Sequence, residues 1–267
     1  MARDGTKMEI QEGTPSYSQL DIAPTVASIL GLQLPNSDGR PIDQVAEWGC
    51  KNVALIIIDS LGYDLMKWLL PHLPNISVLM EEGMLLSAEA VSNHTTPAIA
   101  SILSGLLPEH HKIMDKAGAK ESSILSLPEL ASAAGLKSAV IMESNGAQVY
   151  SGLIEIANGI PDTIPPEEFD RQACRMTMEA LLQRPRLLVS YFIGIDKSVH
   201  LGRGAKEIRT AAMLIDLCIG KILRAADPET LFILCGDHPI HAGLLKRDKG
   251  PYAVALILGK VRAKGAS

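Results

Sequence analysis

The 267-residue chain lacks the features that mark several classes of protein. It has no run of Lys and Arg that would predict a nucleic-acid-binding surface, and no apolar stretch close to the ~20 residues that a membrane-spanning helix needs. The first residues, 1–7, contain no apolar signal-peptide core. These absences predict a cytoplasmic protein without a membrane or nucleic-acid partner, and nothing in the sequence indicates an oligomeric state.

Aromatic residues and cysteines are also scarce. Aromatic residues make up 4% of the chain, so the sequence shows no evident stacking pocket for a nucleobase. The four cysteines, Cys50, Cys174, Cys218 and Cys235, form neither a CxxC pair nor a zinc-finger spacing. We therefore expect buried free thiols, as in a reducing compartment.

Hydrophobic residues, by contrast, are abundant. They make up 47% of the chain, and 267 residues suffice for one large α/β domain. The formal net charge is −5. This negative balance does not exclude phosphorylated substrates, because bound cations dominate the local field at a metal site.

Apolar runs alternate with helical segments along the chain. Residues 53–58, 187–195 and 230–235 have the composition of buried strands, and 167–183 and 205–226 are typical of helices. The same reasoning predicts further helices over 22–30, 61–70, 96–106 and 128–134, and further strands over 84–91, 137–142 and 252–258. The alternation favours a three-layer α/β/α sandwich with a mostly parallel central sheet. No repeat or linker divides the chain, so we assign residues 1–267 to a single domain.

Six metal-capable side chains lie at three places that follow predicted strands. They are Asp59, Asp196, His200, Asp237, His238 and His241. Ligands bind at strand ends in open α/β sheets, and Zn²⁺ and Mn²⁺ accept carboxylate and imidazole ligands together. Each residue taken alone is more often a turn or capping residue, so the prediction of a metal site depends on their joint placement.

A threonine pair supplies hydroxyl groups between the first and second of these places. Thr95 and Thr96 lie near the start of a predicted helix that has Pro97 at its first position. Free backbone N–H groups and the helix dipole favour an anion there. Two metal ions about 4 Å apart would bind a phosphoryl group and activate such a hydroxyl. The residues themselves therefore suggest a metallohydrolase with either threonine as the nucleophile.

Four segments share their order and spacing with one known family. They are 56–64 (IIIDSLGYD), 95–97 (TTP) followed by 104–111 (SGLLPEHH), 196–202 (DKSVHLG) and 236–238 (GDH). Together they resemble the alkaline phosphatase superfamily, especially its nucleotide pyrophosphatase/phosphodiesterase branch. The resemblance covers residues 52–243 and implies the α/β/α fold of that superfamily.

The resemblance implies a role for each candidate residue. The family's nucleophile lies two residues before its proline, which selects Thr95 over Thr96. One divalent ion would be held by Asp59, Asp237, His238 and the Thr95 oxygen, and a second by Asp196, His200 and His241. Zinc is the expected metal and manganese the alternative. In most relatives the last histidine lies much farther beyond the DH pair than His241 does.

One segment stands at the opposite end of the chain from its usual place in the family. Residues 20–35 (LDIAPTVASILGLQLP) and 37–40 (SDGR) look like the segment that relatives carry after their last metal histidine and a strand ending in Gly. Here the chain stops after such a strand, 251–259. We therefore predict a circular permutation in which residues 1–45 correspond to the usual C-terminal segment, with both termini in one surface loop.

The resemblance implies a metal-dependent phosphoric ester hydrolase with a small phosphorylated substrate. The T-x-P context of Thr95 favours a phosphodiesterase or nucleotide pyrophosphatase, and no Arg follows closely to grip the extra oxygens of a monoester. Sulfatases of this superfamily carry Cys or Ser with a nearby Arg at that place. The alternatives are a phosphomonoesterase with the same site and a metal-binding relative without turnover.

Overall fold

The computed structural model describes residues 17–81, 83–242 and 252–260. Its strands are β1 (Tyr17–Ser18), β2 (Asn52–Ile58), β3 (Met84–Glu89), β4 (Ser138–Glu143), β5 (Ile156–Ile160), β6 (Leu187–Phe192), β7 (Thr230–Gly236) and β8 (Ala253–Lys260). They form one sheet in the order β1-β3-β8-β7-β2-β6-β4-β5. Strand β8 is antiparallel to both neighbours, and the other pairings are parallel.

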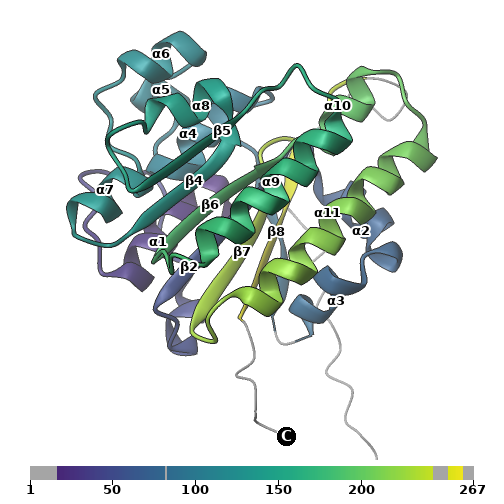
Figure 1. The fold of residues 1–267 in the computed structure, drawn as a ribbon. Coiled ribbons are helices and arrows are strands. Elements are labelled where there is room, and N and C mark those ends of the chain that lie inside the picture. The colour runs from purple at the N-terminus through teal and green to yellow at the C-terminus, as the bar shows by residue number, and fades with distance from the viewer. Residues whose placement is uncertain (1–16, 82, 243–251, 261–267) are drawn as a thin grey trace, which may run out of the picture.

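Helices cover both faces of this sheet. They are α1 (Ile22–Leu30), α2 (Tyr63–Leu69), α3 (Pro74–Met80), α4 (Thr95–Ser104), α5 (Pro108–His111), α6 (Lys116–Glu121), α7 (Leu127–Ala133), α8 (Ser144–Val149), α9 (Pro166–Leu181), α10 (Gly194–His200) and α11 (Ala205–Ala225). Helices α9 and α11 cross one face, where α11 also packs on α3, and α1, α4 and α7 pack together on the other (Figure 1). The predicted three-layer sandwich with a mostly parallel sheet is confirmed.

The centre of the sheet fixes the edge at which side chains can gather. Strands β2, β6 and β7 are buried along almost their whole length, as parallel strands covered on both faces must be. Ile58 at the end of β2 pairs with Phe192 of β6 and with Gly236 of β7. The three strands therefore end level with one another, and the residues that follow them meet at one edge.

The strand predicted over 187–195 is shorter than expected. It ends at Phe192, and the chain turns into α10, which places Asp196 in the first turn of a helix. The cause is a side chain from another element, because Asp170 of α9 accepts hydrogen bonds from the backbone of Ile193 (3.0 Å) and Gly194 (3.3 Å). The apolar sequence gives no sign of this turn.

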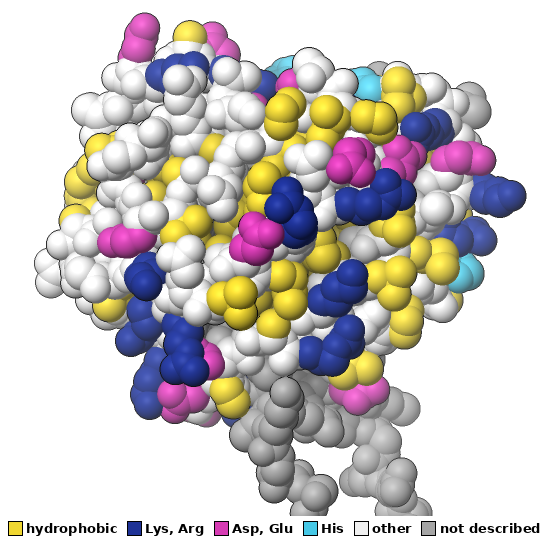
Figure 2. All heavy atoms as spheres, viewed as in Figure 1, with side chains coloured by type: hydrophobic (Ala, Val, Ile, Leu, Met, Phe, Trp, Pro, Cys, Tyr) yellow, Lys and Arg dark blue, Asp and Glu magenta, His cyan; other side chains and the backbone are white. Residues whose placement is uncertain are grey.

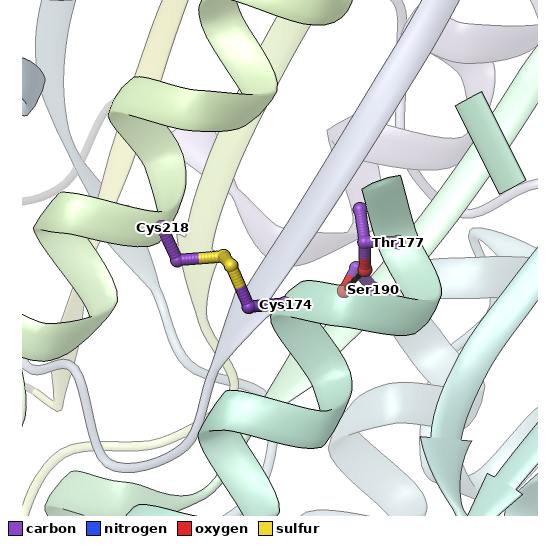
Figure 3. The surroundings of a disulfide bond; sticks show 4 residues. All are labelled: Cys174, Thr177, Ser190 and Cys218. Carbon is purple, nitrogen blue, oxygen red and sulfur yellow. Dashed lines mark hydrogen bonds between the residues drawn. A yellow bond between two sulfur atoms is a disulfide. The ribbon is translucent and has the colours of Figure 1, made fainter. Parts of the chain in front are cut away.

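The prediction of free thiols is wrong for two of the four cysteines. Cys174 of α9 and Cys218 of α11 form a disulfide with a Cα–Cα distance of 5.6 Å (Figure 3). Nearby, Thr177 Oγ1 lies 2.6 Å from Ser190 Oγ and ties α9 to β6. Cys50 and Cys235 are free and buried. With two of the four cysteines in a disulfide, the cysteines give no support for a reducing compartment. The cytoplasmic location stays a prediction.

The segment expected at the C-terminus of a relative packs near β8. Tyr17 of β1 pairs with Ala88 of β3, and Ala88 pairs with Val254 of β8. The side chain of Asp21 accepts hydrogen bonds from the backbone of Ser18 (2.8 Å) and Arg40 (3.0 Å) instead of capping α1. Both termini lie outside the described residues, so the circular permutation stays a prediction. The assignment of residues 1–267 to a single domain also stays a prediction.

The face formed by α9 and α11 mixes charges with apolar groups. Figure 2 shows Lys and Arg side chains interspersed with acidic and hydrophobic ones, without a field of one sign on this face. Met213 and Leu217 of α11 are exposed. Within the described residues, no helix has both the length and the apolar character to cross a bilayer.

Candidate metal centre and nucleophile

Asp59, Asp237 and His238 meet where β2 and β7 end. His238 Nε2 lies 3.3 Å from Asp59 Oδ1 and 3.5 Å from Asp237 Oδ2. The three side chains are buried, with at most 5% of each residue exposed, and their ligand atoms lie within 4.8 Å of one another. We call these residues the first cluster.

Two backbone features bring the first cluster together. A Cβ atom at Gly236 would collide with the backbone oxygen of Leu61, so only glycine lets β7 approach the turn after β2. In that turn Ser60 has a left-handed conformation, with φ of 64°. Its N–H thereby donates to Asp237 Oδ1 at 3.0 Å. The unusual backbone at Ser60 is thus part of what positions Asp237.

Each carboxylate of the first cluster has one paired and one unpaired oxygen. Tyr191 donates its hydroxyl to Asp59 Oδ2, and backbone N–H groups of Ser60 and His238 donate to Asp237 Oδ1. Among the described residues, none donates to the buried Asp59 Oδ1 or Asp237 Oδ2. A buried acceptor without a partner costs about 1–3 kcal/mol. These two oxygens are the ones that face His238 Nε2.

The histidine ring presents a third lone pair to the same place. His238 Nδ1 lies 3.1 Å from the carbonyl oxygen of Pro239, which can only accept a hydrogen bond. In the neutral ring Nδ1 therefore carries the proton, and the lone pair of Nε2 points at the two unpaired oxygens. Two carboxylate oxygens without a donor, beside a ring nitrogen whose one close hydroxyl is that of Thr95, fit a bound cation. The residues present thus pass this test for a divalent metal.

Burial raises the pKa of both acids of the first cluster. It raises the pKa of Asp59 well above its ordinary value, and the charges of Asp237 and Asp196 raise it further. Burial also raises the pKa of Asp237 to about 7. A cation would favour the ionised forms of both groups.

Thr95 borders the first cluster. It is the first residue of α4, and its Oγ1 lies 3.2 Å from His238 Nε2. Pro97 is the third helical residue and not the first as predicted, but it still lies in the first turn, where no backbone N–H is required. The structure therefore sets the hydroxyl of Thr95 against the metal-capable groups.

Asp196, His200 and His241 form a second cluster. Asp196 and His200 are four residues apart on α10, with 3.5 Å between Asp196 Oδ1 and His200 Nε2. The ligand atoms of the three residues lie within 4.8 Å of one another. Asp196 is buried, His241 half-buried and His200 exposed. Burial and the neighbouring His238 lower the pKa of His241, which favours the neutral, ligating form.

One serine joins the two clusters. Ser60 Oγ donates to Asp196 Oδ1 at 2.8 Å and lies 3.3 Å from His238 Nδ1. His241 Nδ1 lies 3.4 Å from the same His238 nitrogen. The structure thus brings together all seven residues that the sequence singled out.

Sequence reasoning missed three residues that hold the first cluster in place, namely Ser60, Tyr191 and Gln19. The fully buried Gln19 donates its amide to the carbonyl oxygens of Gly236 (2.8 Å) and Asp237 (2.6 Å), and its Oε1 accepts from Val91 N at 3.0 Å. No local pattern reports a contact between residues 217 positions apart.

Two protein-family models match parts of the chain. The Sulfatase model matches residues 51–159, which include Asp59 and Thr95. The Type I phosphodiesterase / nucleotide pyrophosphatase model matches residues 132–248, which include Asp196 and Asp237. No curated protein sequence matches the chain.

Solved structures share the fold at low sequence identity. Phosphonoacetate hydrolase from Sinorhizobium meliloti 1021 is 14% identical with a TM-score of 0.60, over 76% of this chain and 59% of that one. BT1596, a 2-O GAG sulfatase, is 12% identical with a TM-score of 0.62, over 79% and 64%. A protein in the alkaline phosphatase superfamily from Vibrio parahaemolyticus is 16% identical with a TM-score of 0.55, over 91% and 68%. The chain thus spans 59% of the length of the phosphonoacetate hydrolase.

Proposed function

The chain belongs to the alkaline phosphatase superfamily, and on that premise we propose that it is a metal-dependent phosphoric ester hydrolase with Thr95 as its nucleophile. The observation that carries this proposal is the convergence of two unpaired carboxylate oxygens on His238 Nε2, 3.2 Å from Thr95 Oγ1. Acceptors gathered beside a hydroxyl suit a site where a cation and a nucleophile act together.

Each cluster offers the ligands for one divalent ion. Asp59, Asp237, His238 and the Thr95 oxygen would hold the first, and Asp196, His200 and His241 the second. Zinc suits this mixture of imidazole and carboxylate, with manganese as the alternative. When bound, the ions would lower the pKa of the Thr95 hydroxyl and offset the charge of the phosphoryl group.

The chain's own residues then divide the reaction between them. Thr95 Oγ1 loses its proton and forms a bond to phosphorus while the bond to the leaving alcohol breaks, and that alcohol takes up a proton in turn. Water then cleaves the Thr95–phosphate bond, which releases the phosphate product and restores the hydroxyl. Ser60 and Tyr191 hold Asp196 and Asp59 in place throughout, so the site is organised before substrate binds.

A phosphodiester is the favoured substrate, as the T-x-P context of Thr95 suggests. A sulfate ester is the second candidate, because the Sulfatase model matches the segment that contains Asp59 and Thr95. Among the described residues that line the cavity beside Thr95, none is an arginine. An arginine fork would serve either a monoester or a sulfate, so its absence there supports the diester.

The test compares chromogenic p-nitrophenyl esters after chelation and resupply of Zn²⁺ or Mn²⁺. We expect metal-dependent cleavage of bis(p-nitrophenyl) phosphate to exceed that of p-nitrophenyl phosphate and p-nitrophenyl sulfate. Thr95→Ala should reduce cleavage at least 10³-fold, Thr96→Ala far less, and the exposed Thr210→Ala not at all. Full activity of Thr95→Ala would overturn the role of Thr95, and preference for the sulfate would make the second candidate the function.

A further inference from the structure

A cavity of about 270 Å³ adjoins Thr95 and runs beside α4. Thr95, Ile99 and Leu103 lie four residues apart, so they form one stripe of the helix, and all three line the cavity. At 1.5 Å per residue this wall is about 12 Å long. The hydroxyl that would attack phosphorus thus lies at one end of an elongated space.

The other walls combine aliphatic side chains with polar and charged ones. Ile113, Ile124, Met142 and Val149 contribute side chains from four further segments of the chain. No Trp, Phe or His belongs to the lining as far as the structure describes it. Its two rings are buried, since Tyr191 is 2% and Tyr150 6% exposed. Among the described residues, the walls therefore offer little ring surface on which a nucleobase would stack.

The charges of the lining do not suit a second anionic group. Outside the two clusters it contains three carboxylates, of Glu129, Glu143 and Asp162, and two ammonium groups, of Lys116 and Lys197. Lys116 Nζ already lies 3.5 Å from both Glu143 and Asp162. One oxygen of Glu129 accepts both hydrogen bonds from Ser126.

We propose that the cavity holds an aliphatic, non-anionic organic group of the ester, and that nucleotides and pyrophosphates are therefore poor substrates. This inference rests on the proposed hydrolase function. The aliphatic side chains of the cavity, on α4 and around it, would bind an alkyl group by removing it from water. The excess of carboxylates opposes a group with negative charge. The helical rise makes the wall along α4 about 12 Å long. That length favours an extended chain over a compact substituent.

The experiment uses p-nitrophenyl phosphodiesters that differ in one group: methyl, octyl, 7-carboxyheptyl and 5′-thymidyl. With the metal-loaded full chain, we expect kcat/KM for the octyl ester to exceed that of each other ester at least tenfold. Ile99→Trp, which narrows the cavity, should lower the octyl-to-methyl ratio at least fivefold. The matched variant Leu217→Trp, on the exposed side of α11, should leave that ratio unchanged.

Binding without turnover separates the two proposals. Calorimetry on Thr95→Ala should show the octyl ester binding at least tenfold more tightly than the methyl ester. Equal cleavage of the methyl and octyl esters, or preference for the thymidyl ester, would overturn the inference and leave the hydrolase function standing. Tighter binding of the octyl ester without cleavage by the metal-loaded wild type would overturn the hydrolase function and support the inference.

Discussion

The two metal-capable clusters share Ser60 but are built on different supports. The first cluster follows β2 and β7, central strands that end level with each other, and all its side chains are buried. The second cluster takes Asp196 and His200 from α10 and His241 from beyond β7, and the His200 side chain is 48% exposed. The contrast indicates a first site fixed by the sheet and a second site whose geometry depends on how one short helix is held.

The largest effect should follow a change in the first cluster. Asp59→Asn replaces a ligand oxygen or the Tyr191-bonded oxygen by an amide NH₂, and we expect kcat/KM to fall at least 10³-fold, about 4 kcal/mol. Elemental analysis should find the first ion lost. In the comparison variant His200→Ala, the second ion should be lost and the first retained. Loss of the same ion from both variants would show that the clusters do not act as separate sites.

The disulfide should matter next, because Cys174 and Cys218 join the two helices that pack on α10. Cys174→Ser should lower the free energy of unfolding by about 3 kcal/mol, through the freedom gained by the unfolded chain. Metal titration should show weaker binding at the second cluster and unchanged binding at the first. Reductant should destabilise the wild type and leave Cys174→Ser unaffected. A wild type that is insensitive to reductant would contradict the prediction.

Gln19 supports the first cluster in the way that Asp170 supports the second. Gln19→Ala leaves the carbonyl oxygens of Gly236 and Asp237 buried without their donor. We expect a loss of about 2 kcal/mol in unfolding free energy and about tenfold weaker binding of the first ion. Chemical denaturation and metal titration measure these changes. Gln44→Ala, at an exposed position, is the control. An equal loss of stability and of metal binding in both variants would show that Gln19 does not support the first cluster.

The smallest effect should be the part of the pH dependence that comes from Asp170, the support of the second cluster. Burial raises the pKa of Asp170 to about 7, above its ordinary value, so the folded state holds a proton that the unfolded state releases above about pH 4. This contribution to stability is present at low pH and is lost as the pH rises toward 7. Asp170→Asn should reduce the decline in unfolding free energy between pH 5 and 8 by about 1–2 kcal/mol, as measured by chemical denaturation at each pH. A profile as steep as that of the wild type would contradict this.

The parts of the site that the sequence predicts are those encoded by short segments. Asp59 and Asp237 each follow an apolar strand, and His238 and His200 lie within a few residues of an acid. The supports were missed because they come from far along the chain. Gln19 lies 217 positions from Gly236, and the bonded cysteines lie 44 apart on two helices. The end of β6 was missed because Asp170, outside the strand, sets it.

The position of Gln19 determines how far the chain can be shortened. Both family matches lie within residues 51–248, which invites expression of that stretch alone. Such a fragment would remove α1 from the helical layer it shares with α4 and α7. It would also delete Gln19 and leave Val91 N, Gly236 O and Asp237 O without their partner. The smallest useful unit therefore begins before Gln19, some thirty residues ahead of the matched sequence.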